Sequence, residues 1–134
     1  FKRKLISYEE CRKLDILKAS IIAQEDEINK AIIEINALPF MKDIAGTRSS
    51  NIYYEMYNTD ADKGLGIQKA IEYRKINDRI LVCIGDFEND LNMLKMADIA
   101  LCPQNAIDEV KKICDKVLPD CRHNTIYHAI KSLK

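Results

Sequence analysis

The segment Ile80–Ile84 constrains the fold most, because all five of its residues are apolar. A strand that is apolar at every position is covered on both faces, as in the centre of a parallel sheet. Gly85 and Asp86 end this strand, a helix is expected from Glu88 to Met96, and a second short strand from Ile99 to Cys102. Two strands joined by a helix predict a βαβ unit, and therefore an α/β chain.

The sequence before this unit predicts a different kind of layer. Up to residue 58 the expected order is α-β-α-β-β, which suits a small α+β layer. The expected boundary lies between Asn58 and Lys63 and separates two domains, 1–58 and 59–134. The expected elements outside the βαβ unit are helices at Ser7–Leu14 and Glu25–Leu38, strands at Ile16–Ala23 and within Lys42–Tyr57, a helix after Lys63, a helix at Ile107–Val117, and a last helix capped by Asn124.

Charge and composition exclude several classes of protein. Lys+Arg and Asp+Glu both number 21, so the chain has no net basic field for nucleic acid or anionic lipid. The apolar run Ile80–Ile84 is far too short to span a bilayer. The five cysteines form no C-x-x-C motif and are odd in number. Reduced cysteines in a cytoplasmic protein explain this pattern best.

The residues that follow the apolar strand carry the clearest chemical signal. Ligands of parallel α/β sheets bind beyond the carboxyl ends of the strands, where helix N-termini direct their amides. Asp86 is expected at the strand tip, with Asn89 and Asp90 in the first turn of the next helix. Two carboxylates and an amide form an oxygen-rich group suited to Mg²⁺. The structural alternative is that Asp86 caps the helix and Asp90 complements its dipole.

A second signal is the lysine in Lys63-Gly64, which is expected at the start of a helix. A cation is disfavoured at a helix N-terminus. A functional reason for Lys63 would be the neutralisation of a phosphate or of a cluster of carboxylates. The alternative is a solvated surface lysine.

In this order, the two signals resemble motifs III and IV of the haloacid dehalogenase superfamily, and most closely its Cof-type phosphatases, which have a large cap. The family pattern resembles E-I-x-P-x-x-x-x-K-G, then G-D-x-x-N-D-x-x-M-L, then A-x-x-x-V-A-x-x-N-A-x-x-x-V-K. The matching segments here are Glu55-Met56, Asp62-Lys63-Gly64, Gly85 to Leu94, Ala97 to Cys102, Asn105-Ala106 and Val110-Lys111.

The resemblance implies a fold, an activity and roles for five residues. The fold is part of an α+β cap (1–58) followed by the C-terminal half of a Rossmann-like core (59–134). The activity is Mg²⁺-dependent hydrolysis of small phosphorylated metabolites, such as sugar phosphates, through an aspartyl-phosphate. Asp86 would bind Mg²⁺, Asp90 would support the metal shell or hold Lys63, Lys63 would neutralise the phosphoryl group, and Asn89 and Asn105 would contact the phosphate.

The chain departs from the family pattern at the nucleophile. It has no D-x-D-G-T, and its one D-x-D, Asp60-Ala61-Asp62, directly precedes Lys63. We therefore expect a fragment that begins inside the cap and is inactive alone. The strand Ile80–Ile84 would then have an open edge and would self-associate or pair with a missing N-terminal segment. The alternative is a non-catalytic phosphate-binding or interaction module derived from the family.

Two other ion sites fit the sequence less well. Asn58, Asp60 and Asp62 alternate like the first ligands of an EF-hand, but lysines stand where that loop needs Gly and Glu. A zinc site would draw on Cys114, Cys121, His123 and His128, and the spacing of its cysteines is not that of a zinc knuckle.

Overall fold

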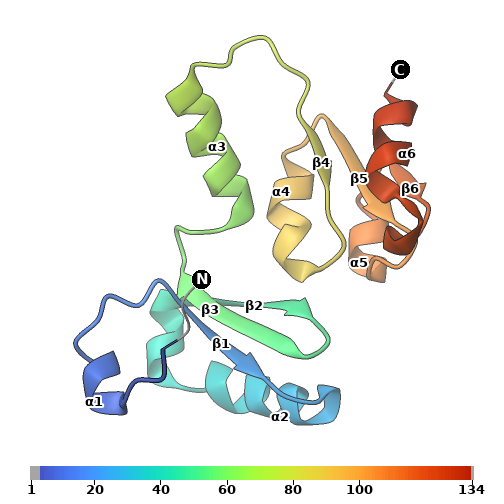
Figure 1. Ribbon diagram of the computed structural model, residues 1–134. Coiled ribbons are helices and arrows are strands. Elements are labelled where there is room, and N and C mark those ends of the chain that lie inside the picture. Colours follow the sequence, from blue (N-terminus) through green and yellow to red (C-terminus); the bar gives the residue numbers. More distant parts are fainter. Residues whose placement is uncertain (1–3, 134) are drawn as a thin grey trace.

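The computed structural model describes residues 4–133, which form two layers, each built on a three-stranded sheet (Figure 1). The first layer contains α1 (Tyr8–Cys11), β1 (Lys18–Ile22), α2 (Glu25–Asn36), the 3-10 helix η1 (Pro39–Asp43), β2 (Ile44–Ser50) and β3 (Tyr53–Asn58). The second contains α3 (Lys63–Arg74), β4 (Val82–Ile84), η2 (Glu88–Asp90), α4 (Leu91–Lys95), β5 (Ile99–Pro103), α5 (Asp108–Lys111), β6 (Lys116–Leu118), η3 (Cys121–His123) and α6 (Thr125–Ser132). The mixed α/β architecture confirms the expected fold class.

The first layer is an antiparallel sheet in the order β1-β3-β2, with α2 along one face (Figure 1). Tyr54 in the central strand is 3% exposed, and its hydroxyl donates to Oδ1 of Asn36 at the end of α2, at 2.6 Å. A Cβ at Gly46 would lie 1.8 Å from the hydroxyl oxygen of Tyr54. Glycine is therefore required where β2 passes this side chain.

The hydroxyl of Tyr54 gives a first prediction about stability. The variant Tyr54→Phe loses the hydrogen bond to Asn36, and we expect the free energy of unfolding to fall by about 1 kcal/mol. Tyr73→Phe is the matched control, because Tyr73 is 85% exposed and should change stability little. Urea unfolding of the two variants measures the difference, and equal stability of both would contradict the prediction.

The second layer is a parallel sheet in the order β4-β5-β6. Its main core cluster combines buried side chains from β4 and β5 with others from α4 and α5, and a second cluster forms between the sheet and α6. The buried members of the main cluster are Cys83, Leu94, Ala100, Cys102, Ala106 and Val110. The predicted βαβ unit is confirmed, with its connection divided into the turn η2 and the short helix α4.

The prediction of one helix from Ile107 to Val117 is wrong. The helix α5 ends at Lys111, and Lys116–Leu118 forms β6, which pairs with β5. Asp115 explains the change, because its amide donates to the carbonyl of Ala100 and its carboxylate accepts from the amide of Ala100, both at 2.8 Å. Strand pairing therefore overrides the helical spacing of the apolar residues. Val117, the last residue of the predicted helix, is 48% exposed.

Other helices and strands also begin or end at residues that differ from the prediction. The Ser7–Glu10 capping box is present, but α1 ends at Cys11. The strand predicted at Ile80–Ile84 is shorter, and Ile80 is 72% exposed. Asn124 precedes α6 as predicted, but it has a left-handed backbone (φ 56°) and its side chain makes no capping hydrogen bond.

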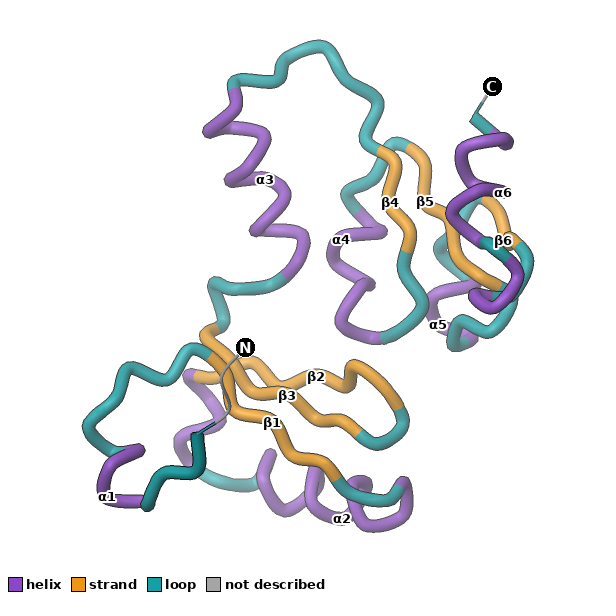
Figure 2. The backbone as a smooth tube through the Cα atoms, viewed as in Figure 1, coloured by secondary structure: helices purple, strands orange, loops and turns teal. Residues whose placement is uncertain are grey.

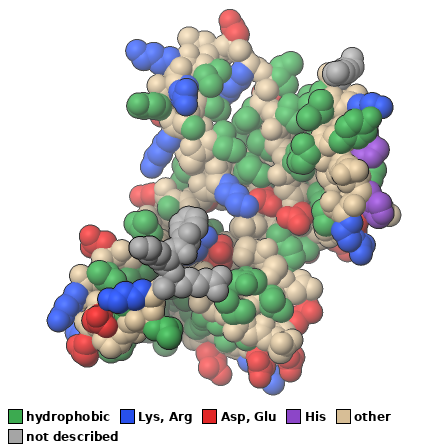
Figure 3. Space-filling model, in the orientation of Figure 1, with side chains coloured by type: hydrophobic (Ala, Val, Ile, Leu, Met, Phe, Trp, Pro, Cys, Tyr) green, Lys and Arg blue, Asp and Glu red, His purple; other side chains and the backbone are tan. Residues whose placement is uncertain are grey.

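Apolar side chains remain uncovered on the second layer, and Figure 3 shows apolar side chains gathered over its helices and strands. Ile126 and Ile130 on α6 are 60% and 56% exposed. Within the described residues, β4 pairs with β5 alone. An open edge beside apolar surface is what the sequence led us to expect, and the association it implies stays a prediction. Across residues 4–133, the structure has no helix with the length and apolarity to cross a membrane.

Residues 59–62 connect the two layers, and the backbone trace in Figure 2 shows the hairpin β2–β3 lying below β4, α4 and α5. The outer strand β2 contacts η2, the turn that follows β4. The first layer therefore lies against the carboxyl end of the parallel sheet, the edge at which α/β proteins bind their ligands.

Candidate active site

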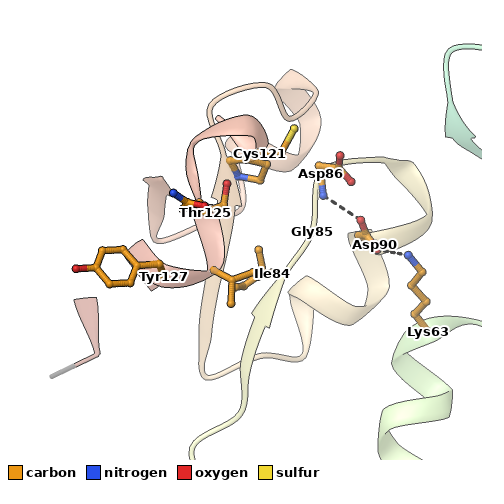
Figure 4. Close-up of a pocket in the computed structure, with 11 residues that line it drawn as sticks. Lys63, Ile84, Gly85, Asp86, Asp90, Cys121, Thr125 and Tyr127 are labelled. Carbon is orange, nitrogen blue, oxygen red and sulfur yellow. Dashed lines mark hydrogen bonds and ion pairs between the residues drawn. The ribbon is translucent and has the colours of Figure 1, made fainter. Parts of the chain in front are cut away.

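The site begins where β4 ends, at Gly85. A Cβ at this position would lie 2.4 Å from the Cβ of Asp90, so only glycine lets the strand exit this close to the helix that follows. Its backbone φ is not positive, so glycine is required here by the close contact with Asp90 and not by the backbone conformation. The chain then turns through Asp86 into η2, which brings Asp90 back beside Gly85 (Figure 4).

Asp90 is the central polar group of the site. Its side chain is 6% exposed, and Oδ1 accepts from Nζ of Lys63 at 2.5 Å. Its other oxygen, Oδ2, accepts from the amides of Asp86 at 2.9 Å and Phe87 at 3.4 Å. Figure 4 shows Asp90 between the lysine and the Asp86 backbone. The buried carboxylate is therefore paired with a cation and with two backbone donors.

Lys63 reaches this position because α3 is fixed at its first turn. Asp62 caps the helix by accepting from the amide of Leu65 at 2.8 Å, and its second oxygen accepts from Nδ2 of Asn92 on α4 at 3.0 Å. Asp90 offsets the cost of a lysine at the positive end of the helix. In the sequence, Asp62 was considered only as part of the D-x-D and of the incomplete EF-hand pattern, although an Asp just before a helix is a common N-cap.

A cavity of about 570 Å³ opens beside these residues. Lys63, Gly85, Asp86 and Asp90 line one side, and residues 124–127 at the start of α6 line the other, as Figure 4 shows for Thr125 and Tyr127. Lys63 is half-exposed there. The ammonium group of Lys63 and the carboxylate of Asp86 therefore border the same cavity.

The five predicted site residues are only partly brought together. Lys63, Asp86 and Asp90 share the 570 Å³ cavity. Asn105 borders a second cavity, of about 560 Å³, which Asp86 also lines and which the turn 49–52 of the first layer faces. The Oδ1 atom of Asn105 accepts from the amide of Cys121 at 2.9 Å. Asn89 borders smaller cavities on the side of Lys63 and Tyr57.

Burial and charge act on the carboxyl group of Asp86. Partial burial is the largest cause that raises the pKa of Asp86 above its ordinary value, and the neighbouring Asp90 carboxylate raises it further. Lys63 acts in the opposite direction and lowers this pKa. The raised pKa means that the folded protein holds this proton more tightly than the unfolded chain does. Ionisation of Asp86 therefore disfavours the folded state, and this loss develops as pH rises through the folded-state pKa.

The variant Asp86→Asn should consequently be more stable than the wild type at pH 7 in metal-free buffer. We expect a gain of less than about 1 kcal/mol, because Asp86, although partly desolvated, is exposed enough for solvent to screen its charge. The gain should disappear at a pH below the ordinary pKa of Asp. Thermal unfolding at both pH values measures it, with Asp108→Asn on the surface of α5 as control. A gain in stability that persists in acid would contradict the raised pKa of Asp86 as its cause.

The alternative zinc site is not assembled. No group of three or more His, Cys, Asp or Glu side chains positioned for a metal occurs in residues 4–133. Burial, followed by contact with Cys102, raises the pKa of the Cys114 thiol to about 12, so this thiol stays protonated at neutral pH. Cys114 packs against the main core cluster instead.

The fold and the site define an α/β protein with acidic and basic side chains at the carboxyl edge of a parallel sheet. The family model for haloacid dehalogenase-like hydrolases matches residues 1–130. The chain belongs to this family, and the resemblance inferred from its motifs is confirmed.

Individual proteins are similar to this chain in sequence or in fold. The chain is 30% identical over 86 residues to the putative phosphatase YxeH of Bacillus subtilis, covering 64% of this chain and 32% of that protein. A haloacid dehalogenase-like hydrolase from B. subtilis superposes with a TM-score of 0.79 at 21% identity, covering 96% of this chain and 46% of the other. A sugar phosphatase of HAD subclass IIB superposes at 0.77 and 22% identity, covering 96% and 47%. The chain thus spans about half of these solved structures and about a third of YxeH.

Proposed function

We propose that this chain is part of a Mg²⁺-dependent phosphohydrolase that acts on small phosphorylated metabolites, sugar phosphates among them. Residues 59–134 would form the C-terminal half of its core and residues 1–58 part of its cap. The observation that carries the proposal is the linked set of Lys63, Asp90 and Asp86 at the carboxyl edge of β4. The phosphatase names of relatives such as YxeH support it.

The donor set fits Mg²⁺ through one direct contact. Asp86 and Asp90 both line the cavity, but both oxygens of Asp90 are already engaged by Lys63 and by backbone amides. Asp86 would therefore contact the ion, and Asp90 would hold Lys63 and the Asp86 backbone in place. Mg²⁺ binds oxygen ligands and keeps several waters, so one protein carboxylate plus substrate oxygens is an ordinary site for it. When bound, the ion would polarise the phosphoryl group as a Lewis acid.

The remaining residues would bind the phosphoryl group. Lys63 is fixed by Asp90 yet half-exposed at the cavity, so its ammonium can approach an anionic oxygen. Asn105 uses Oδ1 on a backbone amide, which leaves its NH₂ group as the donor toward the second cavity. Asn89 would contribute from the side of Lys63. Charge neutralisation and positioning are the main tasks of a protein in phosphoryl transfer.

This chain contains no D-x-D-G-T, the motif that carries the attacking carboxylate in the family pattern. An aspartyl-phosphate mechanism would need that group from residues outside these 134. We therefore propose that the 134 residues alone are inactive. The partial coverage of the relatives supports this proposal.

The experiment compares this chain with the product of its native gene in an assay for phosphate release from small phosphate esters with Mg²⁺. We expect no release above background from the 134 residues alone, and release by a native product of roughly twice this length. Robust Mg²⁺-dependent activity from the 134 residues would contradict the proposal that they are an inactive part of a longer enzyme. A native product no longer than this chain would favour the non-catalytic phosphate-binding module, for which the missing D-x-D-G-T is the specific observation.

A further inference from the structure

Apart from the connecting segment 59–62, a single hydrogen bond joins the two layers in the described part of the chain. The backbone amide of Arg48 on β2 donates to Oε2 of Glu88 in η2, at 3.2 Å. Between residues 4–58 and 63–133, the described side chains form no ion pair. Glu88 therefore carries the polar link between the layers by itself.

Arg48 connects this link to the rest of the first layer. One guanidinium nitrogen, Nη1, donates to Oδ1 of Asn29 on α2 at 3.0 Å, and Nη2 donates to the carbonyl of Asn51 in the β2–β3 turn at 3.1 Å. The strand β2 lies at the edge of its sheet and bulges between Arg48 and Ser50. An edge strand leaves amides without a partner in the sheet, and Glu88 supplies an acceptor for this one.

Glu88 is equally well connected to the candidate active site. It begins η2 two residues after Asp86 and two before Asp90, and the amides of Asp86 and Phe87 donate to Asp90. The backbone of Glu88 cannot shift without a shift of this short, internally bonded turn. The position of β2 is thus tied to the position of Asp86.

The space around the hydrogen bond is poorly filled. A cavity of about 270 Å³ lies on one side, between β2 (Gly46, Thr47) and α4 (Asn92, Lys95). The cavity of about 560 Å³ lies on the other side, between the turn 49–52 and Asp86. Packing on these two sides therefore does little to fix the first layer, and the hydrogen bond from Arg48 has no close-packed substitute there.

We propose that Glu88 is a positioning residue that fastens the antiparallel layer over Asp86. The carboxylate holds Arg48, Arg48 holds α2 and the β2–β3 turn, and the whole layer keeps a fixed orientation relative to the parallel sheet. Loss of the carboxylate frees the layer to turn about residues 59–62 while each layer stays folded. Glu88 would set this orientation whether or not the protein is a phosphatase.

Two readouts on Glu88→Ala test this by NMR, with Glu34→Gln on the exposed surface of α2 as the charge-matched control. We expect the amide of Arg48 to exchange with solvent about tenfold faster in Glu88→Ala. The amides that pair β2 with β3 should keep their exchange rates. Residual dipolar couplings from residues 4–58 and 63–133 should fit one alignment tensor in the wild type and in Glu34→Gln, and two in Glu88→Ala.

A second variant, Glu88→Gln, keeps an acceptor oxygen without the charge and guards against a variant that fails to fold. Its Arg48 amide should exchange at a rate between those of the wild type and Glu88→Ala, because an uncharged acceptor binds more weakly. An unchanged Arg48 rate in either variant overturns the proposal. So does a uniform acceleration of all β2–β3 amides, which would mean general destabilisation, or a single alignment tensor in Glu88→Ala.

Discussion

Replacing Asp90 with alanine is expected to lower the free energy of unfolding by about 3 kcal/mol, one of the two largest effects that this structure predicts. The carboxylate is nearly fully buried and accepts from Lys63 and from the amides of Asp86 and Phe87. Alanine leaves these amides without an acceptor and leaves the ammonium of Lys63 without its counter-charge. The cost of unpaired donors, rather than the loss of Coulomb attraction alone, sets the size of the effect.

Urea unfolding measures the change, and two further variants show its cause. Asp108→Ala removes an exposed carboxylate from the first turn of α5 and should cost less than about 1 kcal/mol. Asp90→Asn keeps one acceptor oxygen and should fall between the two. If Asp90→Ala were no more destabilising than Asp108→Ala, the buried network would not contribute to stability as described.

Replacing Gly85 with alanine is the second large effect, with an expected loss of about 2 to 3 kcal/mol. The new Cβ would lie 2.4 Å from Cβ, 2.8 Å from Cγ and 2.9 Å from Oδ2 of Asp90, so β4 and η2 must move apart. That movement lengthens the hydrogen bond from the amide of Asp86 to Asp90. Stability and the alignment of Lys63 with Asp86 are therefore lost together.

Gly66→Ala is the matched control for this substitution. Gly66 lies inside α3, and a Cβ there would meet no atom within 4 Å. Alanine in a helix interior is favoured over glycine by about 1 kcal/mol, so Gly66→Ala should stabilise the protein. Opposite signs for the two glycine variants in thermal unfolding support the contact argument. A neutral Gly85→Ala would contradict it.

The β4–β5 pair of the parallel sheet was predictable because its signal is local. The apolar run followed by glycine and aspartate indicated a strand and its exit, and Cys83 at the centre of the observed strand Val82–Ile84 is buried as that pattern requires. The capping box of Ser7 and Glu10 is likewise contained within four residues. Lys63, Asp86 and Asp90 were singled out for the same reason, since each stands at a strand end or a helix start.

The parts that sequence reasoning missed depend on distant partners. Lys116–Leu118 is a strand only because β5 lies beside it. The hydrogen bonds that hold this pairing join Ala100 to Asp115, fifteen residues later in the chain. Nothing near Glu88 in the sequence indicates a bond to an amide forty residues away. The roles proposed for Asp86 and Asp90, which the sequence left open, rest on which carboxylate oxygens already accept hydrogen bonds.

The most direct test of the central claim is the rate of phosphate release by the native gene product with Mg²⁺ and with a chelator, for the wild type and for Asp86→Asn. We expect release that requires Mg²⁺ and falls at least about a hundredfold in Asp86→Asn, although this variant should be folded and, in metal-free buffer, slightly more stable. Full activity in the chelator, or in Asp86→Asn, would contradict the assignment of Asp86 and with it the proposed site.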